Sequence, residues 1–147
     1  EGFPIEGGKG KFVPAKILPS DELPNEEFSM ILTTGRQLEH WHTGAMTRRA
    51  SNLDAIEPEP TVSLSPKDIE NIKLNPGDYV NVTTRRGSIK LRIRQDTSIP
   101  KGLIFIPFCY HEAAANILTN AALDPYGKIP EFKYCAAKIN TLNKHYD

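Results

Sequence analysis

Side chains suited to holding an anion or a flat polar ring gather in the first third of the chain. Residues 33–36 read Thr-Thr-Gly-Arg, and residues 40–44 read His-Trp-His-Thr-Gly. A glycine lets backbone N–H groups come close to a ligand, and the Arg36 guanidinium offers a planar fork of donors for phosphate or a carbonyl-rich ring. An ordinary turn with a solvated arginine would have the same four residues, so the tetrapeptide alone leaves both interpretations open.

His40 and His42 also allow a metal interpretation, because alternate residues of an extended segment point the same way and imidazole binds zinc, copper or iron. His111 or Cys109 could supply a third ligand. No carboxylate or cysteine stands at compact spacing, so loop histidines are favoured and no metal ligand is predicted. The two cysteines, Cys109 and Cys135, form no CxxC pair and are expected to be reduced and buried.

A second group of candidate residues lies toward the end of the chain. Phe108 follows an apolar run, Asn116 falls in an expected helix, and residues 130–133 read Pro-Glu-Phe-Lys. Asparagine has both a donor and an acceptor, phenylalanine a flat apolar face, and lysine a mobile cation. Each residue by itself is typical of an ordinary core or surface position. No Gly-x-Ser-x-Gly motif accompanies them, so nucleophilic catalysis is not indicated.

The elements that must position these residues read as strands and turns. The chain has 147 residues, 12 prolines and 10 glycines, which favours one domain with many turns. Residues 1–27 show no periodicity and are predicted to be a lead-in arm or linker, and residues 36–60 a long excursion with one helical turn near 49–55. In the remaining segments apolar and polar residues alternate, or apolar residues follow one another without interruption. Strands are predicted over 28–34, 61–64, 79–84, 88–94, 103–106 and 134–142, and short helices over 66–72 and 111–120.

Six short strands without alternating βαβ units predict a mainly β fold, a small closed barrel rather than a doubly wound sheet. Within it, the residue 103–106 strand is continuously apolar and is expected to be buried on both sides. The 85–87 Arg-Arg-Gly segment closes a hairpin between two alternating strands.

Charge and hydropathy exclude several function classes. The chain has 18 Lys plus Arg and 18 Asp plus Glu, so no overall bias toward nucleic acid or acidic membrane surfaces is expected. The most apolar run, residues 102–110, is about half the length of a membrane span, and no signal peptide precedes it. The sequence opens without methionine, so we expect a soluble segment cut from a longer polypeptide.

The order of the motifs resembles one family. Leu-Thr-Thr-Gly-Arg, His-Trp-His-Thr-Gly-Ala-Met-Thr-Arg-Arg, Asn-Pro-Gly-Asp with Arg-Arg-Gly, Ala-Asn-Ile-Leu-Thr and Pro-Glu-Phe-Lys follow one another over residues 28–142. This order is similar to that of the C-terminal dinucleotide-binding domain of molybdopterin oxidoreductases, and within them of the formate dehydrogenase catalytic (alpha) subunit. The resemblance implies a six-stranded double-psi β-barrel with two or three short helices, residues 28–147 forming the molybdopterin dinucleotide-binding domain.

The resemblance also implies an activity and its partners. The cofactor would be molybdopterin guanine dinucleotide, with molybdenum or tungsten held by other domains, and the whole enzyme would oxidise formate to carbon dioxide. The metal-ligating Cys or selenocysteine, the catalytic His and the cluster cysteines would lie in earlier domains, so this chain alone has no catalytic residue and should be inactive. Expected partners are the remaining domains of the catalytic subunit and iron–sulfur electron-transfer subunits, with no membrane insertion and a cytoplasmic location, the periplasm remaining open.

By position, the 34–36 segment matches the first cofactor-contacting turn of the family. His40, His42 and Thr43 fall in the following loop, where similar domains reach the pterin and the phosphates. Asn116 matches a residue that hydrogen-bonds the pterin. The implied cofactor-binding residues are Thr34, Gly35, Arg36, His40, His42, Thr43, Phe108, Asn116, Phe132 and Lys133.

Phe132 and Lys133 match the last contact segment, and Phe108 stands where related domains can carry Tyr, so that its contact is expected to be packing only. The 46–59 loop differs widely among relatives and its role is open. For the assignment to hold, the loops around 34–43, 116 and 132–133 must converge at one rim of the barrel.

Two alternative functions belong to other classes of protein. A free-standing small subunit with the same barrel, as in formylmethanofuran dehydrogenases, fits the length of the chain. A non-catalytic protein-interaction barrel, similar to the N-terminal domains of certain unfolding ATPases, would leave the Thr-Gly-Arg turn without a ligand.

Overall fold

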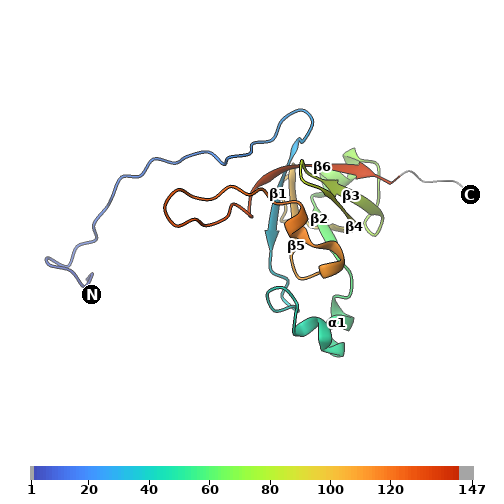
Figure 1. Cartoon of the computed structure of the whole chain (residues 1–147), viewed down its shortest axis with the longest axis horizontal. Helices are drawn as coiled ribbons and strands as arrows, with labels where there is room; N and C mark the ends of the chain where they lie inside the picture. The colour runs from blue at the N-terminus through green and yellow to red at the C-terminus, as the bar shows by residue number, and fades with distance from the viewer. Residues whose placement is uncertain (1, 143–147) are drawn as a thin grey trace, which may run out of the picture.

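Six strands close into a barrel, which confirms the predicted fold class. The computed structural model describes residues 2–142, and within them the strands follow one another around the barrel as β1-β5-β2-β4-β3-β6 (Figure 1). β1 pairs with β5 and β2 with β4 in parallel, while the other neighbours are antiparallel. The bounds are β1 Met30–Gly35, β2 Thr61–Leu64, β3 Tyr79–Thr83, β4 Ser88–Gln95, β5 Leu103–Pro107 and β6 Cys135–Thr141.

The helices are short. α1 spans Ser51–Ile56 and α2 Pro66–Asn71, and η1 Thr47–Arg49 is a 3₁₀ turn. α2 begins as the sequence predicts, because the Ser65 side chain accepts a hydrogen bond from the Asp68 N–H and proline occupies the first turn. None of the helices within residues 2–142 has the length and hydropathy needed to cross a bilayer.

The predicted helix over residues 111–120 is wrong. This segment forms two 3₁₀ turns, η2 His111–Ala113 and η3 Ala115–Ile117, separated by an extended Ala114. The Leu118 carbonyl accepts hydrogen bonds from the Thr84 hydroxyl and the Arg86 guanidinium, so tertiary contacts take the place of intrahelical ones. Figure 1 shows this orange segment beside β5.

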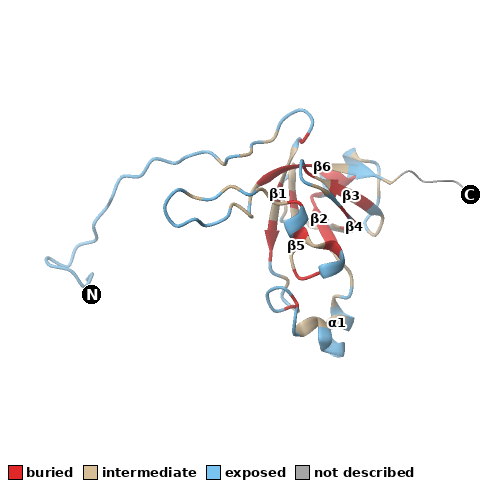
Figure 2. Ribbon diagram, in the orientation of Figure 1, coloured by how far each residue is buried: buried red, intermediate tan, exposed pale blue. Residues whose placement is uncertain are grey.

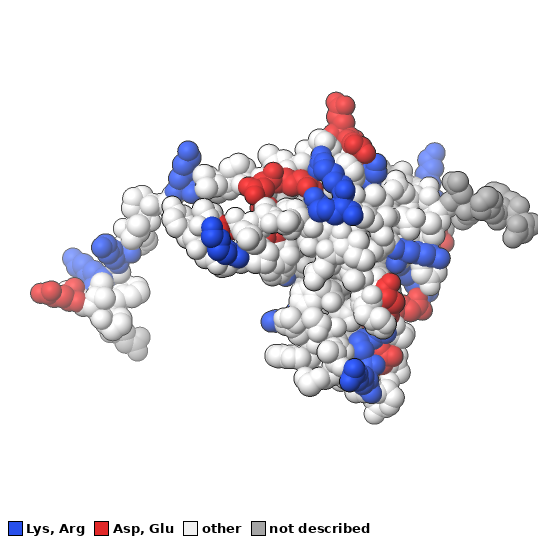
Figure 3. Space-filling model, viewed as in Figure 1, with Lys and Arg blue, Asp and Glu red and all other residues white. Residues whose placement is uncertain are grey.

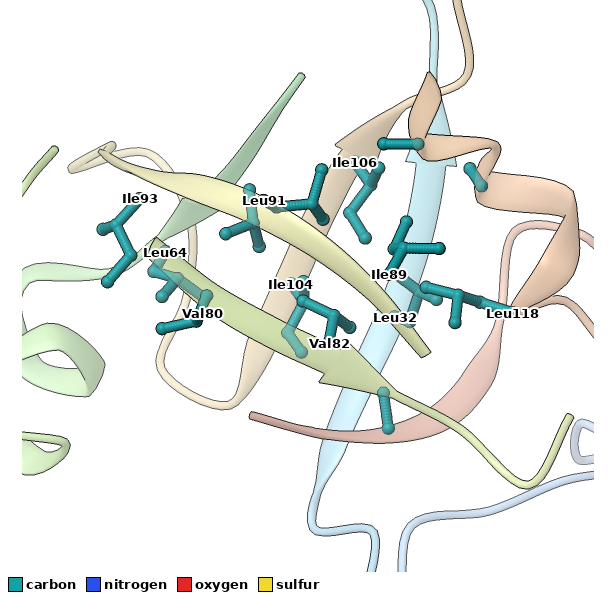
Figure 4. Close-up of a cluster of buried hydrophobic side chains, with 14 of the residues drawn as sticks. Leu32, Leu64, Val80, Val82, Ile89, Leu91, Ile93, Ile104, Ile106 and Leu118 are labelled. Atoms are coloured by element: carbon teal, nitrogen blue, oxygen red, sulfur yellow. The ribbon is translucent and has the colours of Figure 1, made fainter. Parts of the chain in front are cut away.

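Alternating side chains fill the barrel. Val80 and Val82 of β3 and Ile89, Leu91 and Ile93 of β4 are buried, while their neighbours along β4 point outward (Figures 2 and 4). The alternation follows from the two-residue period of a strand. β5 alternates as well, since its residues 103 and 105 are only partly buried, so the expectation of burial on both sides is wrong.

The pairing of β1 with β5 brings two distant segments to the same rim. The strands run parallel with Gly35 opposite Pro107, so the segments that follow β1 and β5 leave the sheet at the same end. The Phe108 N–H donates to the Gly35 carbonyl at 3.1 Å and extends this contact beyond the strands. β6 runs antiparallel to β1, with Cys135 opposite Leu32, so residues 132–134 enter the barrel near this rim.

The N-terminal arm has no helix or strand over residues 2–27 and runs away from the barrel in Figure 1. It attaches at Glu22, whose side chain is only 14% exposed. The carboxylate accepts hydrogen bonds from the Arg86 guanidinium and, at 2.8 Å, from the Ala136 N–H, and Arg85 lies 3.3 Å away. The hydrogen bond with Arg86 holds the pKa of Glu22 below its ordinary value.

This attachment should depend on pH. Because the pKa of Glu22 is lower in the folded chain than its ordinary 4.5, ionised Glu22 stabilises the fold above that pH and the effect disappears as pH falls through the folded-state value. Glu22→Gln should lower the free energy of unfolding by about 2 kcal/mol near neutral pH, the size of a hydrogen bond to a charged group. Urea denaturation near pH 7 and at about pH 3.5 measures the free energy of unfolding of the unchanged protein and of Glu22→Gln. The difference between the two values should be smaller at the lower pH.

Glu27→Gln is the matched control, since Glu27 is 65% exposed in its ion pair with Lys138. An exposed pair of this kind contributes little, so its loss should hardly change unfolding at either pH. A stability difference for Glu22→Gln that is equal at both pH values would contradict the prediction.

Candidate functional site

The three sequence stretches expected to form one surface converge at the rim where β1 and β5 end. A hollow of about 290 Å³ lies there, which we call the Asn116 hollow. Its walls come from the loop after β1, the end of β5, η3 and the segment before β6. The lining residues are His42, Thr43, Phe108, Asn116 and Phe132.

A second hollow of about 440 Å³ shares His42, Phe108 and Phe132 with the first, and we call it the Arg36 hollow. It is completed by the side chains of Arg36 and Lys133. Together the two hollows form a continuous surface in which aromatic faces alternate with donors. Seven of the ten residues predicted from the sequence line it.

Two shared side chains set the floor of this surface. The His42 ring lies 5.4 Å from the Phe108 ring, centroid to centroid, at an angle of 60°. His42 has a φ of 52°, in the left-handed region that non-glycine residues adopt rarely. This backbone conformation turns the loop after β1 toward the end of β5, so that Thr43 follows into the Asn116 hollow.

Thr34 does not line either hollow but holds the segment that does. It is buried, its hydroxyl donates to the Phe132 carbonyl at 2.8 Å, and its own carbonyl accepts from the Lys133 ammonium at 2.5 Å. The same ammonium lies 5.8 Å from the Phe108 ring centre and 5.4 Å from that of Phe132. Thr34 and Lys133 therefore fasten the last loop to the end of β1.

Gly35 is required for space rather than for an unusual backbone conformation. A Cβ at this position would overlap the ring of Phe105 on the paired strand. A side chain at residue 35 would require the Phe105 ring, or the strand that carries it, to shift.

His40 lies away from both hollows. It is 2% exposed, its Nε2 donates to the Glu57 carbonyl at 2.8 Å, and its Nδ1 faces the Thr47 hydroxyl at 3.3 Å. The Tyr110 hydroxyl donates to the same Glu57 carbonyl at 3.0 Å. His40 thus closes the base of the 37–57 loop, and both of its nitrogens are engaged by protein atoms.

The metal alternative for His40 and His42 has no third ligand in the structure. Among residues 2–142, no three His, Cys, Asp or Glu side chains are grouped so that they could hold an ion. Cys109 and Cys135 are buried free thiols, as the sequence predicts, and burial raises the pKa of each.

Arg48 is held by carboxylates from two other segments of the chain. Its guanidinium pairs with Asp54 at 2.5 Å and Glu112 at 3.0 Å and lies 4.7 Å from the Tyr110 ring centre. It lines a further hollow of about 550 Å³, next to the Asn116 hollow through Thr43. No sequence pattern indicates these contacts, because the acidic partners lie in different elements, Asp54 in α1 and Glu112 in η2.

Most arginines are neutralised by neighbouring carboxylates. Arg48, Arg85, Arg86, Arg92 and Arg94 each form an ion pair, and over residues 2–142 the two arginines without one are Arg36 and Arg49. Both border the hollows at this rim. Positive and negative side chains alternate on the face seen in Figure 3, so the chain has local donors for an anion rather than a broad charged field.

Arg36 has a nearby aromatic neighbour. Its guanidinium carbon lies 5.9 Å from the ring centre of Trp41, which is 64% exposed. A fourth hollow beside them, of about 590 Å³, is lined by residues 36–42 with Thr47 and Leu53. The guanidinium therefore stands between two concave surfaces and can donate into either.

The chain is similar to several known proteins. A family model for the molydopterin (molybdopterin) dinucleotide binding domain matches residues 30–136. The F420-dependent formate dehydrogenase subunit alpha of Methanocaldococcus jannaschii is 44% identical over 140 residues, which cover 95% of this chain and 21% of that protein. The F420-dependent formate dehydrogenase 1 subunit alpha of Methanococcus maripaludis is 41% identical over 135 residues, covering 92% and 20%. The chain thus spans about a fifth of these relatives.

A solved structure supports the fold. Acetylene hydratase from Pelobacter acetylenicus superposes with a TM-score of 0.74 over 85% of this chain and 21% of that one, at 21% sequence identity. At this identity the likeness concerns the barrel architecture.

The fastening by Thr34 can be tested by removing its hydroxyl. Thr34→Val should lower the free energy of unfolding by about 1–3 kcal/mol, because the part-buried Phe132 carbonyl loses its donor. Hydrogen exchange at residues 132–135 should accelerate more than in the barrel strands. Thr33→Val is the matched control on the same strand, where no side-chain hydrogen bond is seen among the described residues and no loss is expected. Equal stability of the two variants would contradict the role given to Thr34.

Proposed function

The chain belongs to the molybdopterin dinucleotide binding domain family, and we propose that its rim binds the cofactor through the Asn116 and Arg36 hollows. The observation that carries this proposal is the meeting of Arg36, Asn116 and the Phe108–Phe132 pair around two adjoining hollows. These residues come from segments separated by up to about a hundred positions in the sequence.

The donors at the rim fit the proposed ligand. A pterin and a guanine are flat rings with donor and acceptor edges, and a pyrophosphate has charge suited to arginine and backbone N–H groups. Asn116 is exposed at the rim and has no protein partner for its side-chain amide in the hydrogen bonds of residues 2–142, so both its oxygen and its NH₂ are free for a ring edge. Arg36 is likewise without an acidic partner there and is free for phosphate.

The other rim residues have complementary roles in this proposal. Phe108, Phe132 and His42 offer ring faces for stacking and exclude water from one side of the ligand. Thr43 offers a hydroxyl between the Asn116 hollow and the neighbouring hollow of Arg48 and Arg49. Lys133 contributes positive charge, although its ammonium also donates to the Thr34 carbonyl.

Thr34, Gly35 and His40 act on the ligand indirectly. Thr34 fastens the Phe132 segment, Gly35 permits the close approach of the strand ends, and His40 holds the loop that carries His42. We therefore separate the ten residues predicted from the sequence into seven that face the ligand and three that position them.

For the whole protein we propose the catalytic subunit of a formate dehydrogenase. The bound cofactor would supply the two-electron redox chemistry at its metal, molybdenum or tungsten. Asn116 would hydrogen-bond the organic part of the cofactor without being a ligand of the metal. The barrel binds, orients and shields the cofactor. The metal ligand and the catalytic residues would lie in the other four fifths of the polypeptide, so the isolated domain should be inactive.

The relatives' names also suggest partners. Both curated relatives are called F420-dependent, and we propose F420 as the final electron acceptor, reached through iron–sulfur subunits or clusters. The free-standing small-subunit alternative is disfavoured because each match falls in about a fifth of a longer alpha subunit. A pure interaction barrel would leave Arg36 and Asn116 without ligands.

Two substitutions test the proposed function in the full-length protein. Arg36→Ala and Asn116→Ala should each lower the molybdopterin guanine dinucleotide bound per mole by about tenfold under limiting cofactor. The charge-assisted hydrogen bond of Arg36 contributes about 1.5–3 kcal/mol, and the neutral hydrogen bonds of the Asn116 amide about 0.5–1.5 kcal/mol each. Pterin content after gel filtration is the measurement. Arg92→Ala and Asn52→Ala, at exposed positions of β4 and α1, are matched controls that should keep full content. Full pterin and metal content in both test variants would refute the proposal.

A further inference from the structure

We propose that Arg86, held by Glu22 of the N-terminal arm, is a positioning residue that fixes Asn116 in the cofactor hollow through the Leu118 carbonyl. This inference rests on the proposed function and adds residues outside the hollows to it. It connects the arm, the β3–β4 turn and η3, and the two ends of the connection, Glu22 and Leu118, are 96 positions apart in the sequence.

η3 has little internal support of its own. It is a 3₁₀ turn of three residues, Ala115–Ile117, and it begins at the extended Ala114 without a side-chain cap. Short 3₁₀ turns have poorer hydrogen bonds than α-helices and depend on tertiary contacts. The orientation of Asn116, the middle residue of η3, therefore depends on how the ends of the turn are anchored.

The anchor is the carbonyl of Leu118, directly after η3. It accepts hydrogen bonds from the Thr84 hydroxyl at 2.9 Å and the Arg86 Nε at 3.0 Å, and the Cys135 thiol lies 3.6 Å away. The Leu118 side chain is fully buried in the core. A carbonyl with this many donors is fixed in direction, and it sits two residues from Asn116.

The β3–β4 turn also packs against η3 where Gly87 meets the side chain of Ile117. A Cβ at Gly87 would come within 2.5 Å of the Cγ2 of Ile117, so glycine lets the turn pack directly against the residue that follows Asn116. The turn thus holds η3 by one hydrogen-bonded carbonyl and one close apolar contact.

Arg86 itself is oriented by Glu22. Its Nη1 and Nη2 donate to the two carboxylate oxygens of Glu22, Nη2 at 3.1 Å, while its Nε donates to the Leu118 carbonyl. The Glu22 carboxylate is in turn fixed by the Ala136 N–H on β6. A planar fork can satisfy both partners at once, which a lysine ammonium cannot do in the same geometry.

The consequence is a link between the arm and the cofactor. Displacing the arm at Glu22 would free Arg86, loosen the Leu118 carbonyl and let Asn116 leave its position. By the reciprocity of coupled equilibria, a cofactor bound at Asn116 would also tighten the arm at Glu22.

The test uses the full-length protein and pterin content under limiting cofactor. Arg86→Lys keeps the charge and removes the fork, and it should lower the bound molybdopterin guanine dinucleotide by roughly tenfold, as removal of a supporting hydrogen bond typically does. Glu22→Gln, which leaves Arg86 in place, should cause a smaller loss in the same direction. In the Asn116→Ala background neither change should lower the content further, because the residue through which they act is gone.

A matched control shows whether the loss of cofactor is specific to Arg86. Arg92 also pairs with a carboxylate, that of Glu59, and donates its Nε to a carbonyl, that of Gly77 at 3.2 Å, but none of its hydrogen bonds within residues 2–142 goes to η3 or to Leu118. Arg92→Lys should therefore keep full pterin content.

The outcomes separate the two claims. Loss of cofactor in Asn116→Ala with full content in both Arg86→Lys and Glu22→Gln would overturn the positioning role and leave the proposed function intact. Arg86→Lys and Glu22→Gln could instead lower the cofactor content as much in the Asn116→Ala background as in the otherwise unchanged protein. That result would show that these residues support the fold in general, and it would also overturn the positioning role. Full content in Asn116→Ala would refute the proposed function itself.

Discussion

The parallel pairing of β1 with β5 is the constraint on which the site depends. With Gly35 opposite Pro107 and the Phe108 N–H bonded to the Gly35 carbonyl, two segments about seventy positions apart must leave the barrel together. Arg36 and Phe108 follow at once, so a cation and an aromatic face lie side by side at one rim. The close approach requires a residue without a side chain at position 35, because the Phe105 ring occupies the space of its Cβ.

The rim residues themselves lie on irregular backbone, and buried polar contacts take the place of regular secondary structure in holding them. Thr34 fastens the 132–133 segment, His40 and Tyr110 fasten the 37–57 loop through the Glu57 carbonyl, and Thr84 and Arg86 fasten η3 through the Leu118 carbonyl. Each contact joins a loop to a residue in or beside a strand. A site built from loops can be well defined when its carbonyls are anchored in this way, since an unpaired buried carbonyl would be unfavourable.

Charge is distributed so that the rim has its own donors while the chain as a whole is neutral. Five of the seven arginines are paired with carboxylates, and the two that are not paired within residues 2–142, Arg36 and Arg49, border the hollows. Composition alone excludes a broad basic surface and leaves only a local anion site. Which arginines are free is decided by loops that meet in three dimensions.

The sequence by itself determined the strands, the closed barrel and most of the rim. Alternation in β3 and β4, the Ser65-Pro66 helix start and the turn residues are local signals, and motif order identified the family and seven residues that line the hollows. Only the tertiary structure decided that residues 111–120 form two 3₁₀ turns, that His40 is buried behind the site, and that Arg48 and Arg86 are anchored by carboxylates. The physical reason is the same in each case: the deciding hydrogen bonds join residues from separate segments of the chain, to backbone carbonyls or carboxylates whose positions have no sequence signature.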